Sequence, residues 1–366
     1  MSRASRFVAV LTLAVSLSGV VSLSGVAVGS GAALGGPVLA KARSASRVAS
    51  GVGRSAGGKG SKSVRANTVL YAPNGRPPGS AAPYVWGEVS SDAAIPAAAS
   101  FEAASTAIVP NNRIFKLLII GSDARPGEDF EKTRGDSIHV FLWNPASNKG
   151  VIAGIPRDSY VNIPGKGMNK ITAALTGAGP LSMLATVNDL SHLDIKNYVI
   201  TGFDGFTRMV DDIGGINVEV NPAMNDPLSG ATFQAGWFSM NGPAALAFSR
   251  NRHSVANGDI GRNNNQGKLL KFALAKLRTE TSSIAGLVKW IETFRRNAST
   301  NLAPSQMLML AQIARSIDPV NVQNITLNGT SKSIKVGKTL TDVVLLDPGY
   351  VGFFQDISHD AVADGK

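Results

Sequence analysis

The stretch FKLLIIGSDARPGEDFEKTRGDSIHVFLWN (residues 115–144) decides the fold, because two apolar runs flank one polar loop. The runs 115–121 and 137–144 have the length and the β-branched and aromatic content of strands. If they pair as neighbours through the loop, the end of the first and the start of the second lie at one edge of a sheet. Asp123 and Asp136 then face one small volume, with Arg134 between them in the sequence.

Further strand-like and helix-like segments alternate along the chain. We expect strands near 150–155, 197–203, 322–327 and 333–336, and helices near 181–190, 204–213, 260–278, 282–294 and 304–316. This order predicts an α/β fold, a layered α-β-α sandwich with a mixed central sheet. No repeat, heptad or composition break divides it, so we expect one domain over residues 101–360.

The N-terminal part has the composition of an export segment. Residues 7–40 carry no charge, and their most apolar part is FVAVLTLAVSLSGVVSL (7–23). We therefore expect residues 1–40 to be a signal anchor or a signal peptide. Length favours an anchor, with the protein at the cell membrane, single-pass and extracytoplasmic. The sequence AKA (40–42) resembles a cleavage site, which would give a secreted protein, and the basic residues after the run argue weakly against simple anchoring.

The basic charge of the chain is a property of its N-terminal part. Ten Lys and Arg and no acidic residue precede Glu88, and they account for all but one of the +11 net charges of the 366 residues. Residues 41–100, rich in Gly, Ser, Ala and Pro, read as a flexible linker. The domain itself is close to neutral, so we expect no nucleic-acid partner; the basic part suits anionic lipid or an anionic wall polymer.

The two aspartates of the opening stretch suggest a metal. Two hard carboxylates without a cysteine nearby suit Mg²⁺ shared with a substrate phosphate rather than zinc. The alternative is that Asp123 caps a turn and Asp136 pairs with Arg134. The histidines show no metal-ligand spacing and read as structural or solvated: His139, His192, His253 and His359.

Basic residues recur where other elements end. Arg157 and Asp158 follow the strand near 150–155, and Lys170 stands at an expected helix start. In ALAFSRNRH (245–253), Arg250 and Arg252 are two apart, so an extended segment would point both to one side.

The helix near 260–278 carries a further pair. Arg262 and Gln266 are four apart and share a face close to a helix N-terminus, which favours anions. Arginine forks bind phosphate oxygens bidentately, so the whole set suits a pyrophosphate and its metal. Taken singly, each arginine is better explained by a surface ion pair, and Asp259 is most simply explained as a helix N-cap.

Seven motifs stand in one order along the chain: GSDAR, TRGDSI, IPRDS, NKI, DDIGGI, NGPAALAFSRNRH and GDIGRNNNQ. In this order they resemble the LytR-CpsA-Psr family of bacterial cell-envelope proteins, over roughly residues 115–278. The resemblance implies an exported, usually membrane-anchored α/β sandwich. It also implies a Mg²⁺-dependent glycopolymer-phosphate transferase, with pyrophosphate hydrolysis as a side activity. The reaction would move a glycopolymer from a polyprenyl-pyrophosphate carrier to peptidoglycan and form a phosphodiester.

Carried over residue by residue, the resemblance implies a role for each motif residue. Asp123 and Asp136 would hold Mg²⁺, and Asp158 would orient Arg157. The implied catalytic residues are Arg157, Asp158, Arg250 and Arg252. The implied pyrophosphate-binding residues are Arg134, Arg157, Lys170, Arg250, Arg252, Arg262 and Gln266. The sequence offers no obvious general base, Asp123 being a candidate only if the metal leaves it free.

One position departs from the family pattern. The family often has Arg before the last Gln, whereas here Asn265 precedes Gln266, which removes one phosphate contact. The family also suggests that the helices near 181–190 and 204–213 flank a groove for the polyprenyl chain. For most of their apolar residues, however, the sequence by itself favours a place in the core.

Two other functions stay open. One is an envelope-related transcriptional regulator or attenuator, against which the export segment, the near-neutral domain and the lack of a helix-turn-helix candidate argue. The other is a non-catalytic wall-binding scaffold of the same fold, which metal-dependent turnover would exclude.

Overall fold

The expected pairing of the two apolar runs is confirmed. The computed structural model describes residues 113–280, 284–336 and 339–365, and the expected anchor (1–40) and linker (41–100) lie outside them. Strands β1 (Phe115–Ser122) and β2 (Gly135–Asn144) pair antiparallel, with Gly121 opposite Ser137 and a register shift after Gly121. The backbone N–H of Asp123 donates to the carbonyl of Arg134 at 3.0 Å, so the loop closes directly at the sheet edge.

The central sheet is mixed, as the sequence predicts. Its order is β11-β6-β1-β2-β3-β12. Strand β6 runs parallel to β1 and β12 runs parallel to β3, while the β1–β2, β2–β3 and β6–β11 pairs are antiparallel. The further strands of this sheet are β3 (Lys149–Gly154), β6 (Asn197–Thr201), β11 (Ser299–Thr300) and β12 (Val322–Thr326).

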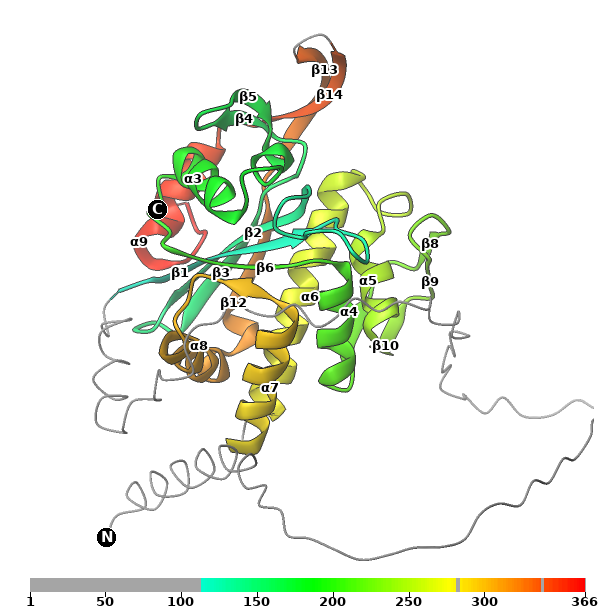
Figure 1. The fold of residues 1–366 in the computed structure, drawn as a ribbon, viewed down its shortest axis with the longest axis vertical. Coiled ribbons are helices and arrows are strands. Elements are labelled where there is room, and N and C mark those ends of the chain that lie inside the picture. Colours follow the sequence, from blue (N-terminus) through cyan, green and yellow to red (C-terminus); the bar gives the residue numbers. More distant parts are fainter. Residues whose placement is uncertain (1–112, 281–283, 337–338, 366) are drawn as a thin grey trace, which may run out of the picture.

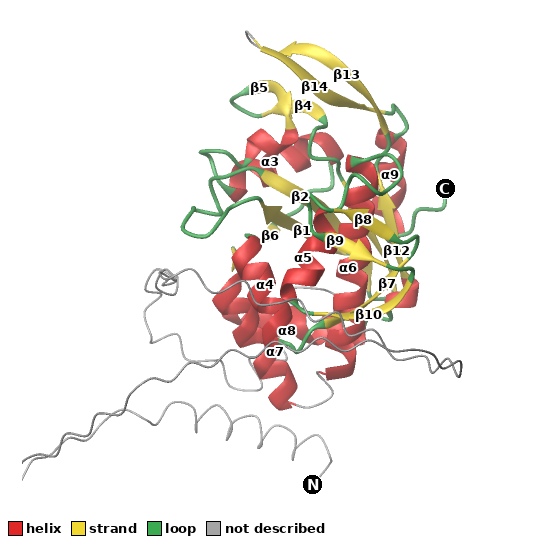
Figure 2. Ribbon diagram, turned by 90° about the vertical axis from the view of Figure 1, so that its right-hand side faces the viewer, coloured by secondary structure: helices red, strands yellow, loops and turns green. Residues whose placement is uncertain are grey.

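Helices cover both faces of this sheet (Figures 1 and 2). Alternate side chains of β1 point to opposite faces of the sheet. Leu118 and Ile120 therefore belong to the core on one face, and Phe115 and Leu117 belong to the core on the other face. The first core is closed by α3 (Pro180–Ser191) and α9 (Tyr350–Asp360), the second by α6 (Asp259–Glu280), α7 (Ile284–Asn297) and α8 (Pro304–Ser316). A third core lies between α4 (Phe203–Asp212), α5 (Gly242–Arg250) and four short strands.

Several elements were missed by the sequence patterns, chiefly short hairpins. They are β4 (Tyr160–Ile163) with β5 (Gly167–Lys170), β7 (Ile216–Val220) with β10 (Gly236–Met240), and β8 (Met224–Asp226) with β9 (Ala231–Phe233). The strand expected near 333–336 is longer, β13 (Gly329–Val336), and pairs with β14 (Thr339–Leu346), a hairpin that projects from the body in Figures 1 and 2. Two short 3₁₀ helices complete the set, η1 (Ile171–Ala174) and η2 (Pro319–Asn321). None of the described helices is long and apolar enough to cross a membrane.

Close packing sets the first turns of α6 against the sheet. A Cβ at Gly154 of β3 would lie 1.8 Å from Oδ1 of Asn263, so only glycine permits this approach. The side-chain amide of Asn263 donates to the carbonyl of Ile155 at 3.1 Å. The N-terminus of α6 is thereby held beside the carboxyl end of β3, where Arg157 follows.

Candidate functional site

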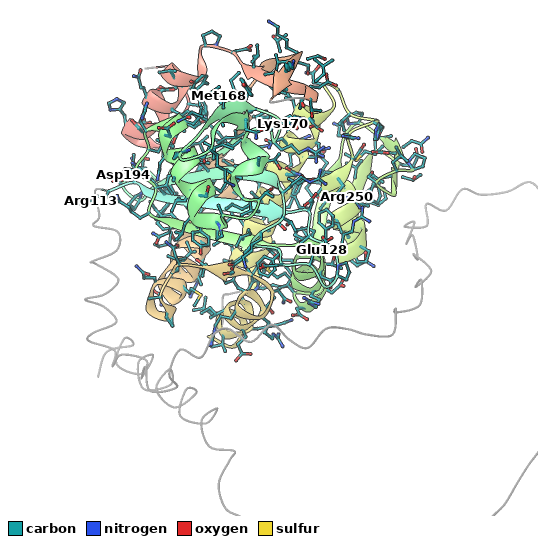
Figure 3. All side chains as sticks on the ribbon, turned by 45° about the horizontal axis from the view of Figure 1, so that its top comes forward. Arg113, Glu128, Met168, Lys170, Asp194 and Arg250 are labelled. Atoms are coloured by element: carbon teal, nitrogen blue, oxygen red, sulfur yellow. The ribbon has the colours of Figure 1, made fainter. Side chains whose placement is uncertain are left out.

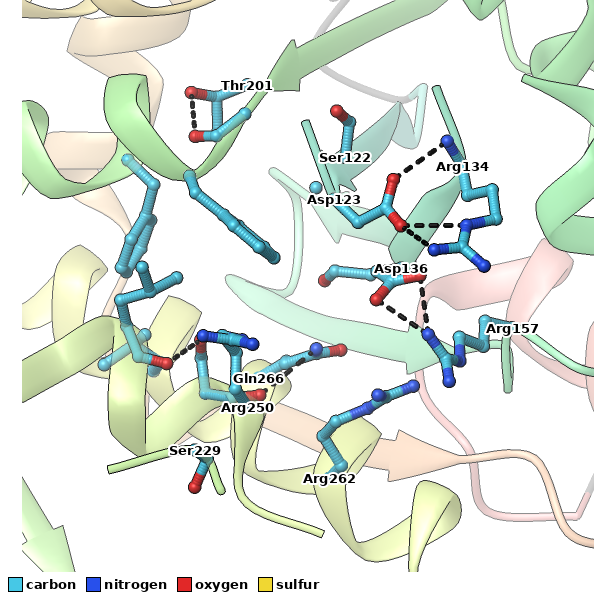
Figure 4. A pocket seen from close by; sticks show the side chains of 18 of the residues that line it. Ser122, Asp123, Arg134, Asp136, Arg157, Thr201, Ser229, Arg250, Arg262 and Gln266 are labelled. Atoms are coloured by element: carbon cyan, nitrogen blue, oxygen red, sulfur yellow. Dashed lines mark hydrogen bonds and ion pairs between the residues drawn. The ribbon is translucent and has the colours of Figure 1, made fainter. Parts of the chain in front are cut away.

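One cavity of about 620 Å³ opens where β1, β2, α4, α5, α6 and the β8–β9 hairpin meet. Eight of the residues singled out from the sequence line it together, and all of them except Arg252 are labelled in Figure 4. They are Asp123, Arg134, Asp136, Arg157, Arg250, Arg252, Arg262 and Gln266. The tertiary structure therefore brings into one volume residues that are up to 143 positions apart in the sequence.

Asp123 and Asp136 lie side by side at the sheet edge, each bonded to an arginine. Asp123 accepts hydrogen bonds from the backbone N–H and Nε of Arg134 at 3.1 and 2.9 Å, and Nη2 lies 2.6 Å from Oδ2. Asp136 stands on β2 and accepts two bonds of 2.8 Å from Nη1 of Arg157. The alternative pairing of Asp136 with Arg134 is thus wrong: Arg134 pairs with Asp123.

Arg157 is the centre of a partly buried charge network. Besides Asp136, its Nε lies 3.4 Å from Asp259 and 3.8 Å from Asp158. Burial alone would lower the pKa of Arg157, but these three carboxylates raise it above its ordinary value. Asp259 is the first residue of α6 and contacts Arg157, Arg252 and Arg262, so its expected role as a simple helix N-cap is incomplete.

The expected shared face of Arg262 and Gln266 is confirmed, since both line the cavity. The Arg262 side chain is 8% exposed, and its Nε has no hydrogen-bond partner among the described residues. Burial and the neighbouring Arg157 lower the pKa of Arg262, although Asp259 opposes the shift. Asn265 is also buried but is not among the lining residues, so an arginine there is not required by this wall.

The expectation of an extended segment around Arg250 and Arg252 is wrong. Residues Gly242–Arg250 form helix α5, whose N-cap Asn241 accepts a hydrogen bond from the Ala244 N–H at 3.0 Å. Both arginines still reach the cavity, because α5 ends at Arg250 and the next turn of chain carries Arg252. The Arg250 guanidinium lies over the Phe203 ring, 4.9 Å from its centroid.

Lys170 and Asp158 stand behind the cavity rather than in its wall. Lys170 ends β5 and precedes η1, a 3₁₀ helix in place of the expected α-helix start; Figure 3 labels it near Met168 of the same strand. Its Nζ lies 2.9 Å from Asp158. Asp158 is 3.8 Å from Arg157, so Asp136, at 2.8 Å, is the stronger partner that orients Arg157.

Asp158 and Asp259 both lie near Nε of Arg157, at 3.8 and 3.4 Å. Burial and the neighbouring Asp259 raise the pKa of Asp158. Burial would also raise the pKa of Asp259, but three arginines and Asp158 hold the pKa of Asp259 below its ordinary value. This pair braces Arg157 and the start of α6 from the side away from the cavity.

Several lining residues were not singled out from the sequence. They are Arg125 and Glu128 in the loop after β1, Asp226 and Ser229 of the β8–β9 hairpin, and His253. His253 was expected to be structural or solvated, but it lines the cavity beside Arg252. The several charged residues in the loop after β1 could have pointed to Arg125. No local sequence feature predicts that Asp226 lines the cavity.

The other end of the cavity is apolar. Phe203 and Phe206 of α4 line it, facing Leu269, Leu270 and Ala273 of α6. Helix α4 thus flanks the cavity as the family pattern suggests. Helix α3 does not, because its buried residues, such as Met183 and Val187, belong to the core on the opposite face of the sheet.

The aspartates of the cavity fit a hard cation. Asp123 and Asp136 present oxygen atoms from side chains that are 15% and 18% exposed. No group of three or more His, Cys, Asp or Glu suited to a metal occurs within the described residues. Magnesium commonly takes only one or two protein carboxylates together with substrate phosphates and water, so two are sufficient.

The family comparison agrees with the motifs. The model of the LytR_cpsA_psr family matches residues 88–344, which is most of the chain. The chain belongs to the LytR_cpsA_psr family.

Individual relatives show how similar this chain is to other members of the family. The polyisoprenyl-teichoic acid–peptidoglycan teichoic acid transferase TagU of Oceanobacillus iheyensis is 33% identical over 192 residues, covering 51% of this chain and 58% of that protein. The probable cell wall biosynthesis protein LcpB of Corynebacterium glutamicum is 38% identical, covering 48% and 44%. The match thus spans about half the length of these curated relatives. The crystal structure of B. subtilis TagV superposes with a TM-score of 0.59 at 27% identity, covering 69% of this chain and 99% of that one.

Proposed function

We propose that this protein transfers a glycopolymer from a polyprenyl-pyrophosphate carrier to peptidoglycan and forms a phosphodiester. The observation that carries the proposal is the composition of the cavity. Six arginines and four carboxylates line it, and the buried Arg262 lacks a partner for Nε among the described residues. Of these arginines only Arg262 is buried, Arg157 is partly buried and the others are exposed. Six guanidinium groups around one cavity outnumber its four carboxylates and suit an anionic ligand such as a diphosphate.

The apolar end supports a lipid carrier. Phe203, Phe206 and Leu270 continue the same cavity beyond Arg250, so a ligand with a diphosphate and a hydrocarbon tail matches both ends. TagU, a relative, is named for transfer of teichoic acid from a polyisoprenyl carrier to peptidoglycan. The substrate class of that relative and the two-ended cavity point to the same chemistry.

The charged residues would act by positioning and charge neutralisation. Arg157, Arg250 and Arg252 would bind the phosphate oxygens, and Arg262 with Gln266 would hold them at the N-terminus of α6. Lys170 and Asp158 would brace Arg157. The acceptor hydroxyl oxygen forms a bond to the sugar-linked phosphorus, and the bond from that phosphorus to the bridging oxygen breaks. Polyprenyl phosphate leaves with the electron pair.

Asp123 and Asp136 would hold Mg²⁺. When bound there, Mg²⁺ offsets negative charge on the phosphate oxygens. Arg134, whose side chain is 65% exposed, can release Asp123 at small cost because an exposed ion pair contributes little stability. Hydrolysis of the pyrophosphate by water is the expected side activity of the same site.

The proposed place of this reaction is the outer side of the cell membrane. The uncharged run 7–40 motivates a single-pass anchor with an extracytoplasmic domain, or secretion after cleavage. Protease added to intact protoplasts should digest the domain. Full protection of the domain would contradict the proposed location.

The decisive test is turnover by the full chain. It is incubated with a polyprenyl-pyrophosphate disaccharide, Mg²⁺ and peptidoglycan fragments, and the products are identified by mass. We expect released polyprenyl phosphate and a phosphodiester-linked fragment, both dependent on Mg²⁺. Binding of the donor without turnover would instead favour the non-catalytic scaffold.

A further inference from the structure

A buried carboxylate on the β8–β9 hairpin holds the loop that follows α5. Asp226 is 1% exposed and accepts hydrogen bonds from the backbone N–H groups of Arg252 and His253 at 3.2 and 3.3 Å. It also accepts one from the backbone N–H of Leu228 at 3.1 Å. Asp226 therefore fixes the backbone at Arg252 and His253 directly, while Asn251 and Ser254 hold the loop beside it.

The same carboxylate contacts the imidazole. Nδ1 of His253 lies 3.1 Å from both oxygens of Asp226. Burial alone would raise the pKa of Asp226, but the N–H groups of Arg252 and His253 hold it well below its usual range. Asp226 is thus ionised and can only accept, so Nδ1 of His253 is the donor.

The second ring nitrogen is left with its lone pair. In a neutral imidazole whose Nδ1 carries the proton, Nε2 is a proton acceptor. No hydrogen bond to Nε2 is present among residues 113–280, 284–336 and 339–365, and the side chain is 44% exposed and lines the cavity. An oriented, accessible imidazole next to phosphate-binding arginines is the arrangement that a general base requires.

The carboxylates of the cavity are less suited to this task. Asp123, the candidate base from the sequence, is bonded to Arg134, and Asp136 is bonded to Arg157. Glu128 accepts the backbone N–H of Arg125 at 2.8 Å. The oxygens of Asp123 and Asp136 are thus bonded to arginines and one oxygen of the exposed Glu128 is bonded to the backbone, whereas Nε2 of His253 has no hydrogen bond among the described residues.

We propose that His253, oriented by Asp226, is the general base that takes the proton of the acceptor hydroxyl. The inference rests on the proposed transferase function. It assigns the residue that acts on the acceptor hydroxyl. As the acceptor oxygen forms its bond to phosphorus, its proton moves to Nε2. The resulting imidazolium is stabilised by Asp226 and afterwards loses the proton to water.

Charges on several elements bear on the pH dependence of this step. Asp226 faces His253 from β8, and Arg252 adjoins it on the same loop. Other elements contribute charged groups to the same cavity: Arg250 of α5, Arg262 of α6, and Arg125 and Glu128 of the loop after β1. These groups act on the acid limb of the rate profile and are left unchanged in the variants below.

The test compares His253→Gln with the parent, using the full chain, a polyprenyl-pyrophosphate disaccharide, Mg²⁺ and peptidoglycan fragments. We expect kcat to fall about 10²–10⁴-fold, the usual effect of removing a general base. The donor KM and the thermal unfolding midpoint should stay close to those of the parent, since the side chain is 44% exposed. The acid limb of the parent pH profile should disappear. His359→Gln, on the exposed part of α9, is the matched control and should behave as the parent.

Two outcomes would overturn the inference. One is a His253→Gln enzyme with nearly parental kcat and an unchanged acid limb. The other is a His253→Lys enzyme as active as the parent, because a permanent cation would then suffice. Both outcomes presuppose a turning-over parent. A parent that releases no polyprenyl phosphate refutes the proposed function itself, so the two failures are distinguishable.

Discussion

Arg157 is the residue whose replacement tests the site most directly, because its guanidinium joins two sides of the cavity. Nη1 donates to both oxygens of Asp136 on β2 at 2.8 Å, and Nε lies 3.4 Å from Asp259 on α6. Lysine at this position keeps the charge but has a single ammonium group without the planar fork. Arg157→Lys therefore satisfies one of these two carboxylates and leaves the other without its partner.

The size of the effect on stability follows from these contacts. A hydrogen bond to a charged group contributes about 1.5–3 kcal/mol. The side chains of Arg157, Asp136 and Asp259 are 20%, 18% and 18% exposed, so water compensates part of the loss. We expect the free energy of unfolding to fall by about 1–2 kcal/mol. In a domain of this size the unfolding midpoint should then fall by roughly 2–8 °C.

The effect on turnover should be larger than the effect on stability. Loss of one aligned donor to the transferred group typically lowers the rate by about 10²–10³-fold. The assay is release of polyprenyl phosphate under steady-state conditions, with thermal unfolding measured on the same preparations.

Arg278→Lys is the matched control for this variant. Arg278 of α6 is likewise an ion-paired arginine, with Nη1 2.7 Å from Asp318, but it does not line the cavity, so turnover should not change. An Arg157→Lys enzyme with parental kcat/KM would refute the assignment of Arg157 to the phosphates.

Four further changes test separate parts of the structure. Asp136→Asn should abolish Mg²⁺-dependent transfer while leaving the fold intact, as circular dichroism would show; normal turnover would contradict the metal assignment. Arg252→Lys should lower kcat/KM by about tenfold or more through loss of the fork, measured with the same donor. Ala273→Phe, in the apolar wall, should raise the KM for long-chain donors more than for short-chain ones, and an equal effect on both would place the tail elsewhere. Burial lowers the pKa of His139 to about 4 from 6.5, so the unfolded chain binds a proton that the folded chain does not. Stability in urea should therefore fall by about 3 kcal/mol between pH 7 and pH 4 through this group, and His139→Met should remove that component.

Much of the framework could be predicted from local patterns. The alternation and length of the runs around Asp123 and Asp136 were sufficient to predict β1, β2 and their shared edge, because strand periodicity is a property of neighbouring residues. The four-residue spacing of Arg262 and Gln266 was sufficient for their common face, because helix geometry is regular. The motif order along the chain was sufficient for the family.

Other features could not be predicted because they depend on partners distant in the sequence. Helix α5 was missed although Asn241 and the alanines after it favour a helix, since the two arginines were interpreted by their spacing alone. Lys170 was expected at the phosphates, but its ammonium group lies 2.9 Å from Asp158 and outside the cavity wall. The carboxylate that pairs with a given arginine depends on which helices and strands pack together. Local sequence patterns do not predict that packing.

The sequence by itself determined the α/β class, the sheet edge that carries the aspartates, and the family. Only the tertiary structure decided the pairing of Arg134 with Asp123 and of Arg157 with Asp136, and the place of His253 in the cavity wall. Asp226 and His253 are 27 residues apart and meet because the β8–β9 hairpin packs against the end of α5. Periodicity reflects only residues that are neighbours along the chain. Ion pairs and buried hydrogen bonds between distant residues form where helices and strands pack together, and these contacts complete the site.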